Sequence, residues 1–179
     1  MFRRLLFAAV VAALTTVPAL ASLQVGATAP DFTTQASLGG KVFDFNLADA
    51  LKKGPVVLYF YPAAFTKGCT IEAHQFADAV DQYKKLGATV IGISHDTIDT
   101  LNKFSVSDCR SKFAVAADPQ LTVAKEYDAV LAQAPTYANR TSYVIVPGGK
   151  IIYTYTDLNP MQHVANTLQA LQQYEASQH

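Results

Sequence analysis

Residues 56–72 read VVLYFYPAAFTKGCTIE, and this stretch decides the fold. Its first part, Val56–Tyr61, is an unbroken run of β-branched, aliphatic and aromatic side chains that stops at Pro62. Such a run is typical of a strand that is buried on both faces. A loop over residues 62–68 follows, and a helical pattern then begins with Cys69 in its first turn. The stretch therefore predicts a buried strand and a loop that leads to a helix with a cysteine at its N-terminus.

Apolar spacing extends this helix beyond the quoted stretch. Phe76, Val80 and Tyr83 recur at i, i+4 and i+7, which places them on one helical face. A later helix is expected to begin with Asp118 as its N-cap and Pro119 as its first residue. The predicted elements beyond the first helix are a buried strand at 89–93, a weaker helix at 97–107, a helix at 119–128, a hairpin of strands 142–146 and 151–155, and a last helix after residue 160.

The order of these elements predicts the fold class. Strand, helix, strand and helix, followed by a hairpin and a helix, describe a βαβ unit and a ββα unit. Packed together, they give an α/β domain with a mixed central sheet flanked by helices, which is the core arrangement of the thioredoxin fold. Residues 22–54 add an N-terminal extension, in which Gly39 and Gly40 are expected to form a turn between two short extended pieces.

The first 21 residues have the pattern of a secretory signal peptide. The basic pair Arg3-Arg4 precedes an apolar run over Leu5–Val17, and Ala19–Ala21 supplies a small-x-small cleavage pattern. The apolar run is shorter than the roughly 20 residues that a membrane-spanning helix needs, which disfavours a membrane anchor. We therefore expect residues 22–179 to form one domain of an exported bacterial protein, either periplasmic or secreted.

Composition and charge disfavour two classes of partner. Half of the 179 residues are hydrophobic, which is enough for a packed core. Lys plus Arg and Asp plus Glu both number 14, so loss of the two arginines of the signal peptide leaves 12 basic against 14 acidic residues and a formal charge of −2. No basic stripe is evident, and we therefore expect neither nucleic acid nor, after signal cleavage, a membrane as partner.

Cys69 and Cys109 are the two cysteines of the chain. In an oxidising compartment, two cysteines most often form a structural disulfide. The predicted place of Cys69 favours a different use, because a helix N-terminus presents unpaired N–H groups and about +0.5 of an elementary charge. Both features stabilise a thiolate, and the same N–H groups can bind a peroxide oxygen as the O–O bond breaks. The position therefore indicates a nucleophile.

The residues around Cys69 resemble the active-site motif of the peroxiredoxins. The motif reads Pro62-x-x-x-Thr66-x-x-Cys69. The residues FYP that end the predicted strand and the residues GCTxE at the helix start are similar to the bacterioferritin comigratory protein (peroxiredoxin Q) branch. The similarity extends from Ala29–Phe32 to Arg140–Tyr143 and the hairpin beyond, which is nearly the whole chain after the signal peptide.

The resemblance implies a role for each of five residues. Cys69 corresponds to the peroxidatic cysteine, which attacks the peroxide and becomes a sulfenic acid. Thr66 corresponds to the hydroxyl that orients the peroxide, and Pro62 to the ring that shields the thiolate from water. Arg140 corresponds to an arginine that reaches the pocket from just before a later strand, and Glu72 to a carboxylate that positions this arginine. Pairing with Arg140 would also neutralise the repulsion between Glu72 and a thiolate.

The chain departs from the branch pattern at the second, resolving cysteine. Many members carry this cysteine five residues after the first, where this chain has His74. On an unbroken helix His74 lies about 140° around from Cys69, and we expect it to be an exposed helix residue. Other members carry the resolving cysteine on the later helix, near Ser105 in this register, and Cys109 follows one turn after that position.

Three interpretations of Cys109 stay open. It resolves the oxidised Cys69 through an intramolecular disulfide, which is the favoured interpretation. Alternatively, it is a bystander, and Cys69 is resolved by a small thiol or by another protein. Finally, the two cysteines form a permanent bridge, which is disfavoured because a permanent disulfide needs neither Thr66 nor Arg140.

The sequence thus predicts a thiol-dependent peroxidase that reduces hydrogen peroxide and organic hydroperoxides. The reductant is expected to be a thioredoxin-like protein or a small thiol, and the protein to be a monomer or weak dimer without cofactor or metal ion. A disulfide oxidoreductase of thioredoxin type would need a second cysteine where Glu72 stands. A peroxide sensor or thiol–disulfide relay would use the same cysteine and is the alternative function.

Overall fold

The computed structural model describes residues 22–178, so the predicted signal peptide lies outside the described residues. The elements in chain order are β1 (Thr33–Leu38), β2 (Lys41–Asn46), α1 (Leu47–Leu51), β3 (Val56–Phe60), α2 (Lys67–Lys85), β4 (Thr89–Ser94), α3 (Ile98–Ser107), β5 (Ala114–Ala117), α4 (Thr122–Glu126), β6 (Thr141–Ile145), β7 (Ile151–Thr156), the 3-10 helix η1 (Pro160–Gln162) and α5 (His163–Ala176).

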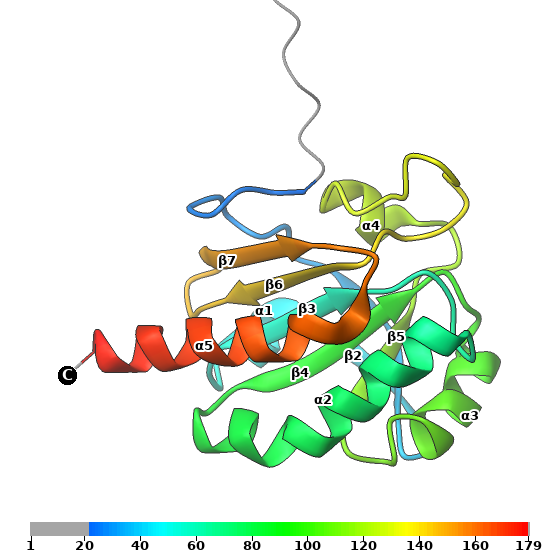
Figure 1. Ribbon diagram of the computed structural model, residues 1–179, viewed down its shortest axis with the longest axis horizontal. Helices are drawn as coiled ribbons and strands as arrows, with labels where there is room; N and C mark the ends of the chain where they lie inside the picture. Colours follow the sequence, from blue (N-terminus) through cyan, green and yellow to red (C-terminus); the bar gives the residue numbers. More distant parts are fainter. Residues whose placement is uncertain (1–21, 179) are drawn as a thin grey trace, which may run out of the picture.

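A mixed seven-stranded sheet runs through the domain in the order β2-β1-β5-β4-β3-β6-β7. The strands β3, β4 and β5 are parallel to one another, whereas β1 is antiparallel to β5 and β6 is antiparallel to β3. The helices α2, α3 and α5 cover one face of this sheet, and α1 and α4 cover the other. Figure 1 shows α2 and α5 side by side in front of the strands. The predicted mixed sheet with flanking helices is confirmed.

The central strand β3 is buried on both faces, as its sequence predicts. Its side chains alternate between two core clusters: Val56, Leu58 and Phe60 pack on the side of α1 and α4, whereas Val57 and Tyr59 pack beneath α2. β3 pairs with β4 on one side and with β6 on the other. Because this strand leads directly into the loop before α2, the core fixes where that helix begins.

The predicted turn at Gly39 and Gly40 is present between β1 and β2, but two short elements were not predicted. The strand β5 has the sequence AVAA, whose small side chains give no clear periodicity, although all four residues are buried. The helix α1 has only five residues, and the side chain of Asn46 caps it by accepting a hydrogen bond from the N–H of Asp49. Elements this short are stabilised mainly by tertiary packing, which the local sequence does not show.

The helix α4 begins later than predicted. Its N-cap is Leu121, in the left-handed conformation with φ of 53°, so Asp118 and Pro119 precede the helix instead of starting it. The carboxylate of Asp118 nevertheless accepts hydrogen bonds from the N–H groups of Thr122 and Ala124, both at 2.8 Å. The expected helix boundary was therefore wrong, because the capping carboxylate reaches the helix across a turn.

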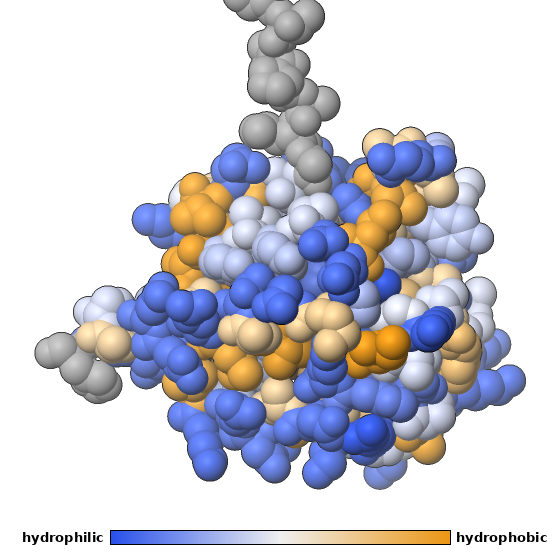
Figure 2. Space-filling model, in the orientation of Figure 1, coloured by the Kyte–Doolittle hydropathy of each residue, from blue (hydrophilic) through white to orange (hydrophobic). Residues whose placement is uncertain are grey.

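The surface formed by α2 and α5 is mostly hydrophilic, with apolar side chains gathered between the two helices (Figure 2). Met161, Val164 and Leu168 line a groove there, and Leu171 is fully buried beneath α5. The apolar strip therefore marks the contact between the two helices. Within residues 22–178, no helix combines the length and the apolar character that crossing a bilayer requires.

Gly92 in β4 leaves room for the ring of Tyr59, since a Cβ atom at position 92 would lie 2.6 Å from Cζ of that ring. We expect Gly92→Ala to lower the free energy of unfolding by about 1–3 kcal/mol through overpacking, measured by urea denaturation. In a Tyr59→Leu background the same substitution should cost less, because the clashing ring is absent. Equal costs in the two backgrounds would contradict this explanation.

Candidate active site

Cys69 lies at the N-terminal end of α2 and is the third residue of that helix. The first hydrogen bond of the helix runs from the N–H of Thr70 to the carbonyl of Thr66, at 2.9 Å. The N–H groups of the three residues before Thr70 have no acceptor within the helix and give its N-terminus a partial positive charge. The exposed fraction of Cys69 is 2%, so only a small molecule can reach its sulfur.

The loop before α2 carries Pro62 and Thr66, which the sequence predicts as site residues, and Phe65, which it does not. Thr66 is the N-cap residue by position, and its exposed hydroxyl donates to the carbonyl of Ala63 at 2.9 Å instead of capping the helix. Pro62 is half-buried directly after β3. Phe65 has a φ of 63°, a conformation that costs free energy for a non-glycine residue, and its ring packs edge-on against Phe104 of α3. The contact between Phe65 and Phe104 therefore links the loop before α2 to α3.

Arg140 is a residue from the second half of the chain that contacts Cys69. It precedes β6, and each of its three nitrogens donates a hydrogen bond: Nη2 to Sγ of Cys69 at 3.4 Å, Nη1 to Oε2 of Glu72, and Nε to the carbonyl of Leu158 at 2.9 Å. Burial by itself lowers the pKa of Arg140, but the facing Glu72 and Cys69 outweigh burial, and the net pKa is raised. The guanidinium therefore keeps its charge beside the sulfur.

Glu72 is fully buried, three residues after Cys69 on α2. Burial raises the pKa of its carboxyl group to about 8, although the charge of Arg140 acts in the opposite direction. The two carboxyl oxygens differ in their surroundings. Oε2 accepts from Arg140, whereas Oε1 has no hydrogen-bond partner in the described part of the chain. A carboxylate oxygen without water or a donor favours the protonated form of the group.

Gly68 leaves space for the guanidinium group of Arg140 beside Cys69. A Cβ atom at position 68 would lie 3.1 Å from Nη2 of Arg140, which is the nitrogen that donates to Cys69. A side chain at this position would therefore press on the nitrogen that donates to the sulfur and force it to shift.

Behind Arg140 lies a buried histidine that the sequence analysis missed. His163 is the first residue of α5 and is fully buried. Its Nε2 lies 2.9 Å from the carbonyl oxygen of Asp157, and its Nδ1 lies 2.8 Å from the hydroxyl of Ser142 and 3.7 Å from Oε1 of Glu72. Burial lowers the pKa of His163 to about 4. A lone histidine at a helix start carries no sequence signal for this position, because its neighbours come from β6 and α2.

Cys109 lies just after α3, in the same core cluster as Cys69. Both are buried free thiols, and burial raises the pKa of Cys109 well above its ordinary value. The adjacent Asp108 ties this turn to α2, since its Oδ1 accepts a hydrogen bond from the hydroxyl of Thr70 at 2.8 Å. The two cysteines therefore share one side of the sheet, and a hydrogen bond between the side chains of Thr70 and Asp108, the residues next to them, links the two segments.

The structure also describes His74 and Ser105, the two positions at which the resemblance leads one to expect a resolving cysteine. The side chain of His74 is 40% exposed, and its Nε2 lies 3.8 Å from Oδ1 of Asp108, so it lies near the end of α3 and is not the plain exposed residue that was expected. Ser105 is fully buried, and its hydroxyl lies 3.0 Å from that of Ser37 and accepts from the N–H of Gly40 at 3.0 Å. Ser105 therefore joins α3 to the hairpin of β1 and β2.

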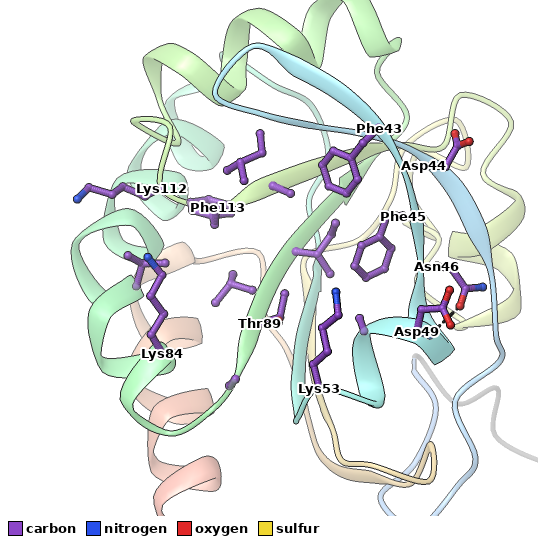
Figure 3. A pocket seen from close by; sticks show the side chains of 17 residues that line it. Phe43, Asp44, Phe45, Asn46, Asp49, Lys53, Lys84, Thr89, Lys112 and Phe113 are labelled. Atoms are coloured by element: carbon purple, nitrogen blue, oxygen red, sulfur yellow. Dashed lines mark hydrogen bonds between the residues drawn. The ribbon is translucent and has the colours of Figure 1, made fainter.

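A cavity of about 470 Å³ lies away from these residues, between β2 and the last turns of α2. Figure 3 shows Phe43 and Phe45 on one side of this cavity and Lys84 on the other. Cys69 and Lys84 are separated by about 22 Å along α2, at 1.5 Å per residue. No predicted site residue lines this cavity. Among residues 22–178, no group of three or more His, Cys, Asp or Glu side chains is arranged to hold a metal ion.

Comparison with known proteins assigns the chain to a family. The sequence model of the AhpC/TSA family matches residues 25–154, which contain all six predicted site residues. The chain belongs to the AhpC/TSA family.

Similar proteins agree with the resemblance to peroxiredoxin Q. The protein named peroxiredoxin Q, chloroplastic, from Oryza sativa subsp. japonica is 35% identical over 148 residues, which are 82% of this chain and 66% of the rice protein. The protein of the same name from Sedum lineare is 33% identical over 153 residues, 85% of this chain and 80% of that protein. The crystal structure of peroxidoxin BcpB from Mycobacterium tuberculosis has a TM-score of 0.76 at 30% identity, over 84% of this chain and 97% of that chain. The predicted branch and the thioredoxin-like fold are thereby confirmed, while the roles of individual residues stay predictions.

Gly68→Ala is expected to displace Arg140 from Cys69 and to slow the reaction of Cys69 with iodoacetamide by about three- to tenfold at fixed pH. The physical reason is the loss of a positive charge that stabilises the thiolate. Mass spectrometry of the alkylated protein measures this rate, and urea denaturation checks that the fold is kept. An unchanged alkylation rate in the folded variant would show that Gly68 does not protect the contact between Arg140 and the sulfur.

Proposed function

We propose that this protein is a thiol-dependent peroxidase that reduces hydrogen peroxide and small organic hydroperoxides at Cys69. The observation that carries the proposal is the position of the sulfur, at a helix N-terminus and 3.4 Å from Nη2 of a buried arginine, Arg140. The helix N-terminus and the guanidinium both favour a thiolate and both stabilise negative charge on an oxygen next to it. Membership of the AhpC/TSA family supports the same reaction.

The proposed first step transfers an oxygen atom to sulfur. The Cys69 thiolate attacks one peroxide oxygen, a new S–O bond forms, and the O–O bond breaks. The sulfur loses two electrons, the departing oxygen takes them as an alkoxide or hydroxide, and a solvent proton completes the alcohol or water. In this proposal Arg140 and the free N–H groups of α2, which lie next to the sulfur, stabilise this negative charge, and the exposed hydroxyl of Thr66 lies at the same helix end.

The low exposure of Cys69 favours small peroxides. With 2% of the residue exposed, attack requires a substrate that fits between the loop of Pro62 and Phe65 and the first turn of α2. Pro62 is half-buried at this place and is proposed to exclude water from the thiolate.

The second half of the cycle is proposed to use Cys109 as the resolving cysteine. Its thiol attacks the sulfenic sulfur, an S–S bond forms, and water leaves. Burial keeps Cys109 neutral, because it raises the pKa of this thiol, so resolution requires local opening of the contact between α2 and the end of α3. A thioredoxin-like protein or a small thiol then reduces the disulfide, with the protein acting as a monomer or weak dimer.

We also propose that the protein is exported and works in the periplasm or outside the cell, with residues 1–21 as its signal peptide. The pattern of a basic pair, an apolar run and a small-x-small site supports this proposal. Detection of a mature chain that begins at Ser22 in a periplasmic fraction would support it, and retention of the full-length chain in the cytoplasm would contradict it.

Cys69→Ser is expected to abolish the consumption of hydrogen peroxide by the purified protein with a dithiol reductant, because a serine hydroxyl forms no stable anion at neutral pH. Cys109→Ser is the matched control, since it is the same substitution at the second buried cysteine, and it should still consume one equivalent of peroxide. Retained turnover in Cys69→Ser would reject the proposed function. Rapid turnover of the native protein with a simple dithiol would also favour the peroxidase over a sensor or relay, which needs a specific partner.

The resolving role of Cys109 predicts a disulfide with Cys69 after one equivalent of peroxide. Non-reducing mass spectrometry should find this disulfide in the native protein and a sulfenic or sulfinic Cys69 in Cys109→Ser. Normal cycling of Cys109→Ser with a small thiol would show instead that an external thiol resolves Cys69.

A further inference from the structure

Asp96 lies at the same edge of the sheet as the loop before α2, and the proposed reaction gives it no role. It is the second residue after β4, which runs parallel to β3, so the segments that follow the two strands are neighbours. Its Oδ2 accepts two hydrogen bonds, from the hydroxyl of Ser94 at 2.7 Å and from the N–H of Ala64 at 2.7 Å. The second bond joins Asp96 to the loop that carries Pro62 and Thr66.

The carboxylate of Asp96 is held in a defined place. Its two donors are sheltered from water, since Ser94 is fully buried and Ala64 is 9% exposed. A distance of 2.7 Å is at the short end of the range for an N–H donor, as expected when the acceptor carries a charge. The next residue, Thr97, is the N-cap of α3 and accepts from the N–H of Thr100. Asp96 is therefore fixed between the end of a strand and the start of a helix.

The peptide group that donates to Asp96 is bound by Thr66 on its other side. The N–H belongs to the peptide bond between Ala63 and Ala64. The carbonyl of this same bond accepts from the hydroxyl of Thr66 at 2.9 Å. The bond is trans, so its N–H and its C=O point in opposite directions. A negative charge at the N–H end polarises the peptide group and makes its oxygen a stronger acceptor. Asp96 and Thr66 are thus linked through one rigid, polarised group.

This link determines what the hydroxyl of Thr66 can do. A threonine at the N-cap position usually accepts a hydrogen bond from the N–H of the second or third helix residue, which here are Gly68 and Cys69. Thr66 has the extended backbone of an N-cap residue, with φ of −78° and ψ of 150°, but its side chain makes no such bond. Because its proton is directed at the carbonyl of Ala63, its oxygen offers lone pairs to a substrate.

The conformation of the loop also requires support from outside the loop. Phe65, between Ala64 and Thr66, has φ of 63°, and such a conformation of a non-glycine residue persists only where surrounding contacts hold it. The ring of Phe65 packs on Phe104, and the N–H of Ala64 donates to Asp96. Of these two contacts, the bond to Asp96 is the one that acts on the peptide group that Thr66 also binds.

We propose that Asp96 is a positioning residue of the peroxide site: its carboxylate fixes the peptide group of Ala63 and Ala64, which keeps the hydroxyl of Thr66 off the N-terminus of α2 and presents its oxygen to the peroxide as an acceptor. The O–H of the hydroperoxide then donates to Thr66, and the N–H groups of α2 stay available for the oxygen that takes the negative charge. This inference rests on the proposed function, because the orientation of a peroxide matters only if Cys69 reacts with one.

The first test compares Asp96→Ala with Asp96→Asn. Alanine leaves the N–H of Ala64 without its acceptor and should slow the oxidation of Cys69 by hydrogen peroxide by about tenfold, the size expected for one hydrogen bond to a charged group. Asparagine keeps an acceptor oxygen and should lose less. Mass spectrometry of rapidly quenched samples measures these rates.

Alkylation of Cys69 by iodoacetamide is the comparison reaction for both variants, because it needs no oriented proton. Asp96→Ala should not slow it. Equal slowing of oxidation and alkylation would show a general loss of loop structure and would overturn the inference, as would an unchanged oxidation rate.

The second test places Asp96→Ala in a Thr66→Val background. Valine has nearly the shape of threonine but lacks the hydroxyl, so the proposed path from Asp96 to the substrate is interrupted. Asp96→Ala should then have no further effect on the rate of oxidation by hydrogen peroxide. The same loss in both backgrounds would show that Asp96 does not act through Thr66 and would overturn the inference.

Asp118→Ala is the matched control. Asp118 directly follows β5, which is parallel to β4, and its carboxylate likewise accepts two hydrogen bonds, at 2.8 Å, from the N–H groups of Thr122 and Ala124. Both donors belong to α4 and not to the loop before α2. Asp118→Ala should lower thermal stability and leave the rate of Cys69 oxidation unchanged.

A readout that is independent of activity separates failure of this inference from failure of the proposed function. Three-bond NMR couplings to Cγ2 of Thr66 report the rotamer of this side chain. The native protein and Asp96→Asn should show the single rotamer that reaches the carbonyl of Ala63, whereas Asp96→Ala should show a changed or averaged rotamer. An unchanged rotamer in Asp96→Ala would overturn the role of Asp96 and leave the peroxidase intact. Lack of peroxide consumption by the native protein would reject the peroxidase, and the couplings would still decide whether Asp96 positions Thr66.

Discussion

One guanidinium group joins three separate parts of the chain around the sulfur of Cys69. Arg140, at the start of β6, donates to Cys69 and Glu72 on α2 and to the carbonyl of Leu158 in the segment before α5. A buried charge is tolerated only when its donors are satisfied, and removing one partner of such a group typically costs about 3–5 kcal/mol. The three acceptors must therefore be in place together. This requirement couples the N-terminus of α2, the start of β6 and the approach to α5, which are far apart in sequence.

The long elements and the position of Cys69 at a helix N-terminus could be predicted because their signals are local. The apolar run of β3 and the helical spacing of Phe76, Val80 and Tyr83 follow from single periodicities, and both elements are where they were expected. The loop between them fixes Cys69 at the helix N-terminus in the same way. Arg140 could be named in advance only through the resemblance to a family, since nothing in its own neighbourhood distinguishes it from a surface arginine.

The remaining features depend on contacts between elements, which a single sequence does not show. The strand β5 consists of small residues whose burial comes from its neighbours β1 and β4. Asp118 caps α4 across a turn, so a rule based on adjacent positions misplaced the helix start. His163 is buried by side chains of β6 and α2, and its own helix gives no hint of this. In each case the residues that make the stabilising contacts lie outside the few adjacent positions that a sequence pattern covers.

The hydrogen bond between Thr70 and Asp108 has a consequence for how much oxidant the protein can withstand. In the proposed cycle it holds the turn of Cys109 against α2, and burial keeps that thiol neutral until the contact opens. The sulfenic acid therefore persists for as long as this opening takes. A second peroxide that arrives within that interval carries the sulfur to sulfinic acid, which thiols do not reverse. In the proposed cycle, the strength of this one side-chain contact would therefore set the peroxide concentration above which the protein is inactivated faster than it is recycled.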